Sequence, residues 1–414
     1  MKKYVIIGNG TAAAGCIEGI RRVDTEGAIT VVSAENHPVY CRPLISYYLE
    51  GKTDPARMKY RPDDFYDKNG CTVRYGRSAV QLDPQQKRVT LDNGETLDYD
   101  ALCVAAGSSP FVPPVSGLDT VPQKFGFLTL DDAEALAAAV TPQSRVLIVG
   151  AGLIGLKCAE GLHGRVRHIT VCDLADRVLS SILDEECAAF VQKHLEQNGI
   201  SFLLGDTAAK FSGTTAEMKS GKTVDFDVLV MAVGVRANSG LVRDAGGSCG
   251  RGIVVDARSA SSLPDVFAAG DCTETTDVSS GTVKVMALMP NAYMQGRCAG
   301  ENMAGGSAKF DNAIPMNSIG FFGLHMMTAG SRVVPPEGEV YEEKTPAYIK
   351  KLFIKENRLI GFVLVGNTAR TGIYTDMIRS RTPLDTVDFD HLKKTPDLLG
   401  FSADIRKKKL GSEV

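Results

Sequence analysis

Residues 146–157 read Val146-Leu-Ile-Val-Gly150-Ala-Gly152-Leu-Ile-Gly155-Leu-Lys157, in which an apolar run enters three glycines spaced G-x-G-x-x-G. This order predicts a strand, a tight turn and the start of a helix. The first glycine permits the turn, the second lets the backbone approach a pyrophosphate, and the third lets the helix pack on the strand. The free N–H groups at the helix N-terminus would face the phosphates. The residues therefore predict a dinucleotide-binding βαβ unit.

A second apolar strand, residues 168–173, is expected after the helix, and it ends in Asp173. Asp173 follows Gly150 by about 20 positions, which is the spacing of a carboxylate that binds the ribose of the nucleotide. Such a carboxylate accepts hydrogen bonds from ribose hydroxyls and repels a 2′-phosphate, so Asp173 favours NADH over NADPH. Arg177 lies near enough to weaken this preference.

The N-terminus carries the same pattern. Residues 1–13 read Met1-Lys-Lys-Tyr-Val-Ile-Ile-Gly8-Asn-Gly10-Thr-Ala-Ala13, with alanine in place of the third glycine. A helix is expected over about residues 11–22 and a second strand over residues 29–33. Two nucleotide sites in one chain imply two nucleotides that react with each other.

The ribose carboxylate of this first site is less clearly marked. Its usual position is the end of the second strand, which here is Ser33, and Glu35 follows two positions later. Glu35 is our candidate, and an ordinary loop acid is the alternative.

A strand followed by small residues occurs once in each half. Residues 99–110 pass through Ala106 and Gly107, and residues 225–238 pass through Gly234. The repetition indicates an internal duplication, and the prolines of residues 110–114 predict an extended linker between the halves. The expected NAD-binding residues are Gly150, Gly152, Leu153, Ile154, Gly155, Asp173 and Gly234.

Composition excludes several functional classes. The 414 residues are 44% hydrophobic and 23% charged, which is typical of a globular protein with two or three domains. The net charge of −3 gives no reason to expect nucleic acid binding. No apolar run approaches the ~20 residues that span a bilayer, and the start of the chain lacks a signal-peptide pattern. We therefore expect a cytoplasmic protein without a membrane partner.

The ten cysteines form no C-x-x-C or C-x4-C pair. This spacing disfavours a zinc site, a local iron–sulfur site and a local redox disulfide. We expect no metal site, and we expect nearly all of these cysteines to be reduced and structural.

The segment after the second strand carries a family resemblance. Residues 40–46 read Tyr-x-Arg-Pro-x-x-Ser, which resembles rubredoxin reductases, ferredoxin reductases and the flavin modules of nitrite reductases within the pyridine nucleotide-disulfide oxidoreductase superfamily. The resemblance implies that Arg42 and Pro43 line the pyrophosphate and the ring of FAD. The guanidinium of Arg42 suits phosphate oxygens because it can bind two of them at once. A surface salt bridge is the alternative role of Arg42.

Further motifs extend the resemblance over nearly the whole chain. A strand ending in Ala269-Gly270-Asp271 returns the chain to the FAD domain in this family, where the aspartate meets the ribityl chain or its phosphate. A helix N-cap is the plainer role for Asp271. A helix that opens at Pro290-Asn291 would point its N-terminus at the flavin pyrimidine. The expected FAD-binding residues are Gly8, Gly10, Thr11, Ala12, Ala13, Glu35, Arg42, Pro43, Ala106, Gly107, Gly270, Asp271 and Asn291.

Two residues depart from the family pattern and are the catalytic candidates. Cys41 lies close to the position of the redox cysteine in relatives that reduce disulfides or peroxide, but it directly precedes Arg42-Pro43. That anchor favours a cysteine that is not redox-active. Lys157 stands where the family commonly has glutamate, in what we expect to be the first turn of a helix, where its charge opposes the helix dipole. It is either a solvent-facing lysine or a cation that meets a phosphate or a carboxamide oxygen.

The last hundred residues differ in character from the rest. Residues 348–366 predict two strands joined by a turn at Glu356-Asn357, residues 371–381 predict a helix, and residues 406–409 predict a solvated basic tail. This region resembles the small C-terminal α+β domain of the same family. Its lysines Lys350, Lys351 and Lys355 would offer a basic face to an acidic iron–sulfur protein.

We therefore predict an α/β protein with two Rossmann-like domains and a small C-terminal α+β domain. The FAD domain is expected over residues 1–112 and 245–315, the NAD(P)H domain over 113–244 and the C-terminal domain over 316–414. The resemblance implies an enzyme that passes electrons from NADH through FAD to a rubredoxin-type or ferredoxin-type iron–sulfur protein. The alternatives are an NADH oxidase, peroxidase or CoA-disulfide reductase, and a flavin-binding sensor or scaffold without turnover. The sequence leaves open whether the protein is a monomer or a homodimer.

Overall fold

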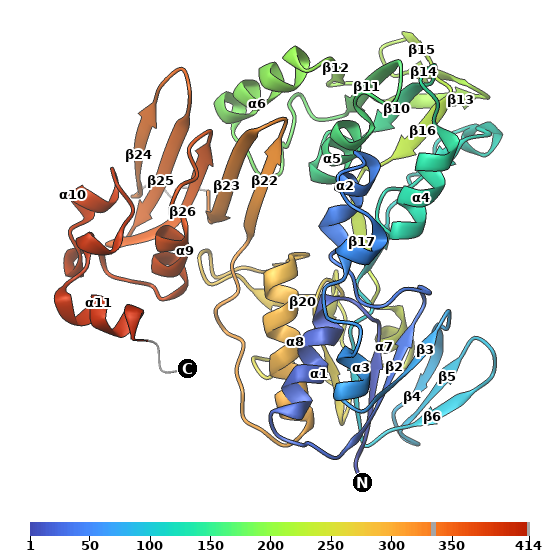
Figure 1. Ribbon diagram of the computed structural model, residues 1–414, viewed down its shortest axis with the longest axis vertical. Coiled ribbons are helices and arrows are strands. Elements are labelled where there is room, and N and C mark those ends of the chain that lie inside the picture. The colour runs from blue at the N-terminus through green and yellow to red at the C-terminus, as the bar shows by residue number, and fades with distance from the viewer. Residues whose placement is uncertain (333–336, 412–414) are drawn as a thin grey trace. The chain divides into compact units, whose positions relative to one another are not determined.

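The computed structural model describes residues 1–332 and 337–411, except for the side chain of Lys408. The chain forms two compact units, residues 1–274 with 285–310 and residues 275–284 with 311–414. Figure 1 shows the elements of both units. The first unit holds both of the halves that the sequence predicts, and the boundaries of the individual domains stay a prediction.

A parallel five-stranded sheet forms the first half of this unit, with the strand order β19-β7-β1-β2-β3. Its central strands follow the sequence prediction closely: β1 is Lys3–Ile7, helix α1 is Thr11–Arg21 and β2 is Ala28–Ser33. The other strands are β3 (Cys71–Tyr75), β7 (Ala101–Val104) and β19 (Val266–Ala268). Because β19 returns to this sheet after the second half, the first half is built from two separate parts of the chain.

A second parallel five-stranded sheet has the order β12-β11-β10-β16-β9. Strand β10 (Arg145–Val149) leads into helix α5 (Leu153–Leu162) and β11 (His168–Asp173), as the glycine motif predicts. The remaining strands are β9 (Lys124–Phe125), β12 (Ile200–Leu204) and β16 (Val228–Met231), and helices α4 (Leu130–Ala139) and α6 (Glu185–Gln197) also belong to this half. The two sheets confirm the predicted α/β fold class.

Smaller elements complete the first unit. Two antiparallel three-stranded sheets consist of β4 (Ala79–Asp83), β5 (Arg88–Leu91) and β6 (Thr96–Asp98), and of β13 (Ala208–Ser212), β14 (Thr215–Met218) and β15 (Thr223–Asp225). Strand β18 (Ile253–Val254) pairs with the part of β20 (Thr273–Thr276) that lies in this unit, and both β20 and β21 (Val283–Val285) cross the division between the units. The short helices are α2 (Ile45–Leu49), α3 (Phe65–Lys68) and α7 (Gly240–Asp244), with 3-10 turns at Arg42–Leu44, Pro55–Met58 and Leu118–Thr120.

The two segments that link the halves pair with each other. Strand β8 (Ser108–Pro110) and strand β17 (Val235–Ala237) form an antiparallel ladder in which Ser108 lies opposite Ala237. Asn238 strengthens this link, because its side chain donates to the carbonyl oxygen of Ala106 at 2.8 Å and its backbone N–H donates to Gly107 at 3.0 Å. The two copies of the motif that is repeated in the sequence therefore pair with each other in the structure.

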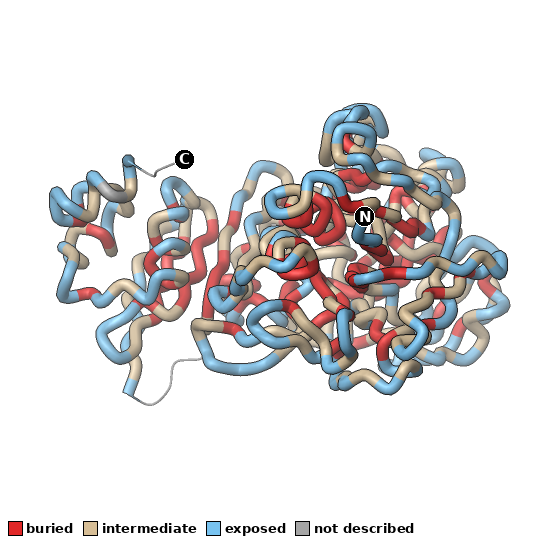
Figure 2. Tube along the Cα trace, turned by 90° about the horizontal axis from the view of Figure 1, so that it is seen from below, coloured by how far each residue is buried: buried red, intermediate tan, exposed pale blue. Residues whose placement is uncertain are grey.

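Helices α1 and α8 (Met289–Met303) lie side by side next to the first sheet (Figure 1). Glycines on both helices allow this close approach. A Cβ at Gly296 would lie 2.0 Å from the carbonyl oxygen of Ala12, and one at Gly300 would lie 2.0 Å from that of Cys16. The contact brings the start of α8 beside the start of α1. Figure 2 shows how the buried segments run through the interior of each unit.

The second unit is an antiparallel five-stranded sheet with its own core. The strand order is β22-β23-β26-β25-β24, with β22 at Met316–Phe321, β23 at Leu324–Gly330, β24 at Glu339–Lys344, β25 at Ile349–Lys355 and β26 at Arg358–Val365. Helices α9 (Gly372–Arg379), α10 (Phe389–Leu392) and α11 (Ala403–Leu410) and two 3-10 turns, Leu384–Thr386 and Leu398–Gly400, follow. The predicted turn at Glu356-Asn357 is confirmed, since both residues have positive φ.

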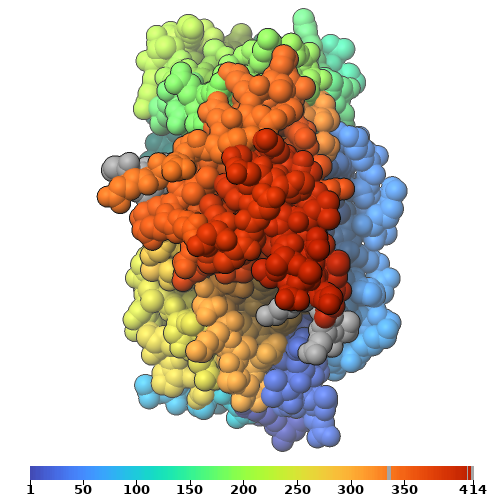
Figure 3. Space-filling view, turned by 90° about the vertical axis from the view of Figure 1, so that its left-hand side faces the viewer, coloured from blue at the N-terminus to red at the C-terminus, as the bar shows by residue number. Residues whose placement is uncertain are grey.

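Two predictions for this unit are wrong. Residues 406–409 were predicted to form a solvated tail, but they belong to helix α11, in which Lys407 is exposed. Lys350 and Lys351 are only 6% and 8% exposed, so they do not offer a basic face. The ammonium of Lys350 donates to Glu343 at 2.9 Å and to the carbonyl oxygens of Lys393 and Lys394. Figure 3 shows one face of this unit, in which residues 311–411 are coloured from orange to red.

Candidate functional site

The first glycine loop joins β1 to α1 and leaves an open space at the helix N-terminus. Gly8 has φ +109, and a Cβ there would lie 2.1 Å from the carbonyl oxygen of Ala105. Gly10 is the N-cap of α1 and makes no side-chain cap, and a Cβ at Gly10 would meet nothing within 4 Å. The first turn of α1, at Thr11, Ala12 and Ala13, therefore begins beside a position where a side chain would meet no other atom.

The second glycine loop repeats this geometry between β10 and α5. Gly150 has φ +120, and its Cβ would lie 2.2 Å from the carbonyl oxygen of Ala232. Gly152 is the N-cap of α5, again without a side-chain cap and with open space around a Cβ. Gly155 packs so closely that a Cβ would lie 1.9 Å from the carbonyl oxygen of Gly150. Each loop thus offers backbone N–H groups and a helix N-terminus to an anion such as a pyrophosphate.

Asp173 stands at the end of β11 and faces the second loop. Its Oδ2 accepts from the backbone N–H of Ala151 at 2.7 Å, and its Oδ1 accepts from that of Ala175 at 2.8 Å. The carboxylate therefore fixes the loop, and each oxygen keeps a lone pair for a further donor. Arg177 donates to Asp176 at 2.8 Å, so that its charge is partly balanced. Leu153 and Ile154 form the first turn of α5, and Gly234 follows β16 with φ +121.

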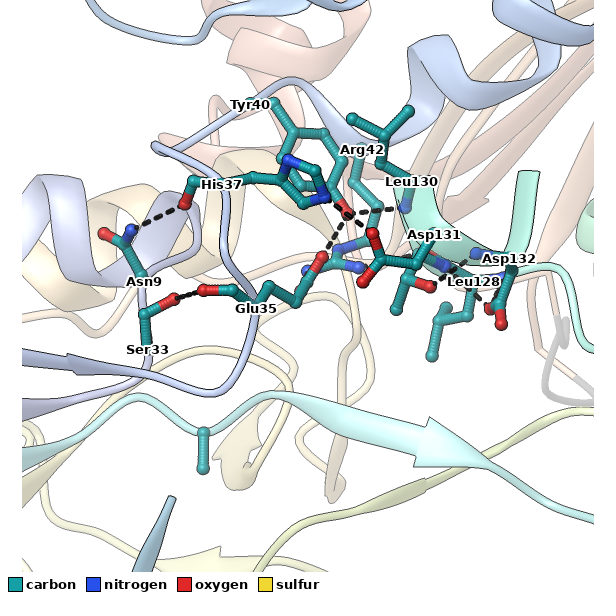
Figure 4. Close-up of polar contacts among 12 residues, drawn as sticks. Asn9, Ser33, Glu35, His37, Tyr40, Arg42, Leu128, Leu130, Asp131 and Asp132 are labelled. Atoms are coloured by element: carbon teal, nitrogen blue, oxygen red, sulfur yellow. Dashed lines mark hydrogen bonds and ion pairs between the residues drawn. The ribbon is translucent and has the colours of Figure 1, made fainter. Parts of the chain in front are cut away.

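The segment after β2 brings Glu35 and Arg42 together (Figure 4). Nη2 of Arg42 donates to Oε1 of Glu35 at 2.6 Å, and Nη1 donates to the carbonyl oxygen of Leu128 at 3.0 Å. The hydroxyl of Tyr40 donates to Oε2 of Glu35 at 2.6 Å and accepts from the N–H of Leu130 at 2.9 Å. Glu35 and Arg42 are therefore held in one polar network, which also ties this segment to the start of α4.

Asp271 lies at the carboxyl end of β19, after Gly270 with φ +83. No described helix begins at Asp271, so the N-cap role is excluded there. Burial raises the pKa of Asp271 to about 6, although the positive charge of Arg42 opposes this rise. A partly buried carboxyl of this kind is suited to accept hydrogen bonds from ligand hydroxyls.

The start of α8 lies next to this aspartate in the fold. Gln295 accepts from the N–H of Gly270 at 2.8 Å, while its own amide nitrogen is buried without a partner among the described residues. Asn291 is buried in the first turn of α8, at 4% exposure. Gly107 has φ +65, and a Cβ there would meet nothing within 4 Å. Together with Ala106 these groups surround the carboxyl ends of the first sheet, where ligands bind in open parallel sheets.

Residues 2–296 match the family model of the pyridine nucleotide-disulphide oxidoreductases. The chain belongs to this family.

Individual relatives cover most of the chain. The NADH-dependent phenylglyoxylate dehydrogenase subunit epsilon of Aromatoleum evansii is 32% identical, and the alignment covers 92% of each chain. A probable ferredoxin reductase of Castellaniella defragrans is 30% identical over 73% of this chain and 76% of its own length. The solved NAD-dependent persulfide reductase of A. fulgidus is 26% identical, with a TM-score of 0.84, over 94% of this chain and 78% of its own.

Membership of the oxidoreductase family fixes the general chemistry. The protein is an NAD(H)-dependent flavin oxidoreductase, and its cofactors are FAD and NAD(H). The structure fits both groups, because a Cβ at the N-cap glycine of each loop would meet no other atom and the first sheet ends in the partly buried carboxyl of Asp271. No cluster of metal-ligating side chains occurs in the described residues. No helix in the described part of the chain has the length and apolar character needed to cross a bilayer.

Cys41 precedes the Arg42–Leu44 turn of this oxidoreductase and is half-buried. Burial raises the pKa of its thiol, so the reactive thiolate is disfavoured. All ten cysteines are free thiols. These observations support the interpretation that Cys41 is not redox-active.

Lys157 is the fifth residue of α5 and not part of its first turn, so its conflict with the helix dipole is weaker than expected. Its ammonium forms an ion pair with Glu160 and lies 5.0 Å from the ring centre of Tyr47 in α2. Only 15% of the Lys157 side chain is exposed, which excludes the solvent-facing alternative.

Sequence reasoning missed several residues of this region. Tyr40 was part of the recognised segment, but its bond to Glu35 depends on the course of the loop. Asn238 closes the repeated motif, and its contact with Ala106 spans more than a hundred residues. Glu160 lies three positions after Lys157, and this spacing is the one signal that could have indicated the ion pair.

Proposed function

We propose that this oxidoreductase passes electrons from NADH through FAD to a small iron–sulfur protein of the rubredoxin or ferredoxin class. The observation that carries the proposal is the state of Cys41. Because its thiol is half-buried and burial raises its pKa, the thiolate that disulfide or peroxide reduction needs is disfavoured at this position. The similarity to the probable ferredoxin reductase of Castellaniella defragrans supports an acceptor that is a separate protein.

The proposed roles follow from the two loops. Gly8, Gly10 and the first turn of α1 would bind the FAD pyrophosphate, with Glu35 near the ribose and Arg42 near the phosphates. Pro43 shapes the turn that places Arg42. Asp271 would accept from the ribityl hydroxyls, and Asn291 would lie near the flavin pyrimidine. When bound, the two cofactors supply the electron chemistry, in which NADH reduces the flavin and the flavin reduces the acceptor.

Gly150, Gly152 and the first turn of α5 would bind the pyrophosphate of the coenzyme. We propose NADH as the preferred coenzyme, since the carboxylate of Asp173 repels a 2′-phosphate. The pairing of Arg177 with Asp176 supports this preference, because it leaves less positive charge available to a phosphate. The protein should also work in the cytoplasm, where ten free cysteines stay reduced.

An NADH oxidase is the second candidate function. An NADH oxidase of Methanocaldococcus jannaschii is 30% identical over 88% of this chain, which favours direct reaction with oxygen. The two functions differ in what consumes the electrons, so one experiment separates them.

NADH and NADPH consumption should be measured with oxygen alone, and then anaerobically with a rubredoxin and with a ferredoxin. We expect kcat/KM to favour NADH, slow turnover with oxygen, and fast reduction of at least one iron–sulfur protein. Cys41→Ser should retain most of this activity. Turnover with oxygen that matches turnover with every iron–sulfur protein would support the oxidase, and loss of turnover in a Cys41→Ser variant that still binds FAD would support a thiol-based reductase.

A further inference from the structure

The loop that follows β2 in the first half bonds to the start of helix α4 in the second half (Figure 4). The hydroxyl of Tyr40 accepts from the backbone N–H of Leu130 at 2.9 Å, across 90 positions of the chain. Nη1 of Arg42 donates to the carbonyl oxygen of Leu128 at 3.0 Å, across 86 positions. These two bonds are called the loop–α4 contact below. The contact joins parts of the chain that belong to different sheets.

The Tyr40 hydroxyl completes the N-terminal cap of α4. The side chain of Thr129 accepts from the N–H of Asp132 at 3.0 Å, and the Asp132 carboxylate accepts from the N–H groups of Leu128 and Thr129. This capping box does not serve the N–H of Leu130, the first residue of the helix. Tyr40 takes this N–H, and both residues are buried. Loss of the hydroxyl would therefore leave a buried donor without its partner.

The same hydroxyl donates to the carboxylate that we propose for the FAD ribose. Its partner is Oε2 of Glu35 at 2.6 Å, while Oε1 of Glu35 accepts from Arg42 at 2.6 Å. Burial raises the pKa of Tyr40 well above its ordinary value, so the hydroxyl keeps the proton that it donates. Carboxylate oxygens and a guanidinium can each make further hydrogen bonds. Glu35 and Arg42 can therefore bind a ribose hydroxyl and a phosphate while they stay joined to α4.

The turn that carries Arg42 lies between two attachments to the second half. The loop–α4 contact is on one side of the turn. On the other side, α2 begins directly after the turn and packs against α5. A Cβ at Gly161 of α5 would lie 2.9 Å from Cβ of Leu49, which shows how close this packing is. The position of Arg42 therefore depends on how the second half is placed.

We propose that Tyr40 is a positioning residue for electron transfer between the two cofactors. Its hydroxyl holds Glu35 and Arg42 against α4, and α4 belongs to the same half as the Gly150 loop. The distance between the bound rings depends on how the two halves are placed, and a displacement of about 1 Å costs up to ~100-fold in rate. This inference rests on the proposed binding of FAD at the first loop and of NAD(H) at the second.

The test uses Tyr40→Phe in the full chain loaded with FAD. The change keeps the ring but removes the partner of the Leu130 N–H and one donor to Glu35. The Tm should fall, and the amides of residues 128–132 should exchange their hydrogens faster than in the wild type. Anaerobic mixing with NADH gives the rate constant of flavin reduction at saturation and the Kd of NADH. The long-wavelength charge-transfer absorbance between nicotinamide and flavin reports the ring geometry independently of turnover.

We expect Tyr40→Phe to lower the rate constant by about fivefold or more and to weaken the charge-transfer absorbance. At saturating FAD its flavin content should equal that of the wild type, because Arg42 still holds Glu35. Its Kd for NADH should stay within about twofold, because the second glycine loop is unchanged.

Tyr4→Phe is the matched control. The Tyr4 hydroxyl is also buried and donates to a carboxylate, Oδ2 of Asp24, at 2.7 Å. Both partners lie in the first half, so that this bond does not join the halves. The control should lose Tm and keep the rate constant and the charge-transfer absorbance of the wild type.

Three results would overturn the inference. If Tyr40→Phe loses Tm and amide protection but keeps the rate constant and the charge-transfer absorbance, the hydroxyl is only structural. If Tyr4→Phe slows the reaction as much, the effect follows from lost stability. If Tyr40→Phe fails to bind FAD, the hydroxyl acts on FAD binding and not on ring placement. Failure of the proposed function is distinct from these, because the wild-type flavin would then not be reduced by NADH although dithionite reduces it.

Discussion

Gly10 and Gly152 occupy equivalent positions in the two halves of the first unit. Each is an N-cap with extended backbone, and a Cβ at either position would project into open space. Gly8 and Gly150 differ from them, because a Cβ there would collide with backbone. The second glycine of each loop can therefore be changed without a clash inside the protein, which allows the two nucleotide sites to be blocked separately.

Gly10→Val should abolish FAD binding while the protein stays folded, because the side chain would occupy the space proposed for the pyrophosphate. Gly152→Val should keep FAD and weaken NADH binding by at least about tenfold. The bound flavin is measured by absorbance, and the Kd of NADH is measured by anaerobic titration. Full FAD retention in a folded Gly10→Val variant would show that the first loop does not bind FAD, and each variant is the control for the other.

The carboxyl of Asp271 has a folded pKa of about 6, against 3.8 for an ordinary aspartate. A carboxyl whose pKa is raised by folding contributes stability at low pH and loses it as the pH rises through the folded value. In FAD-free protein this group should therefore cost nothing well below pH 3.8 and about 3 kcal/mol above pH 6. The stability contributed by this group should therefore change with pH mainly between the two pKa values, 3.8 and about 6.

Urea unfolding of FAD-free wild type and Asp271→Asn at several pH values tests this expectation. The variant should be the more stable protein at pH 7, and its advantage should shrink as the pH is lowered to 5. Other titrating groups cancel in the difference between the two proteins. An advantage that does not change with pH would mean that the carboxyl is not buried in the FAD-free state.

At the scale of elements, local pattern was sufficient for most of the first unit. The glycine spacing predicted β1, α1, β10 and α5, since Gly8 and Gly150 have positive φ and no room for a Cβ, and Gly155 packs against Gly150. The contacts between Glu35 and Arg42 could not be predicted, because they depend on how a loop of seven residues turns back. The pairing of β8 with β17 could not be predicted either, although the sequence showed the repeated motif that contains both strands.

The wrong predictions have a common physical cause. Lys350 was predicted to lie on a basic face, but the chain after α10 returns over this strand and its carbonyl oxygens accept from the ammonium. The basic residues 406–409 suggested a tail, but Ser402 caps a helix there, and Lys409 pairs with Asp376. In both cases a distant segment satisfied a charge that the local sequence left exposed. Such tertiary partners are absent from any local pattern.

At the scale of the whole molecule, each unit has its own apolar core. The first unit contains the cores on the two sheets, and the second contains the core of Phe362, Tyr374 and Leu392. The proposed FAD residues all belong to the first unit. A ligand that binds only the folded form of one unit stabilises that unit by mass action.

Calorimetry of FAD-free protein should therefore show two unfolding transitions. FAD at about 100 times its Kd should raise the free energy of unfolding of one unit by about 2.7 kcal/mol. The transition temperature of the other unit should not change. Proteolysis between the two transition temperatures would identify the unit that unfolds first. A single transition that moves as a whole on adding FAD would show that the two units unfold together.

The ladder between β8 and β17 also decides where this protein could be cut and recombined. The prolines of residues 110–114 suggest a convenient boundary for exchanging the coenzyme half with that of a relative. A cut there would keep β8 but replace both β17 and Asn238 with the relative's residues. The foreign strand would then have to pair with Ser108–Pro110 without Asn238. Chimeras that transfer residues 108–238 as one block keep both strands and the asparagine together. Libraries that exchange residues 108–238 should contain more proteins that fold and bind FAD than libraries that are cut within residues 110–114.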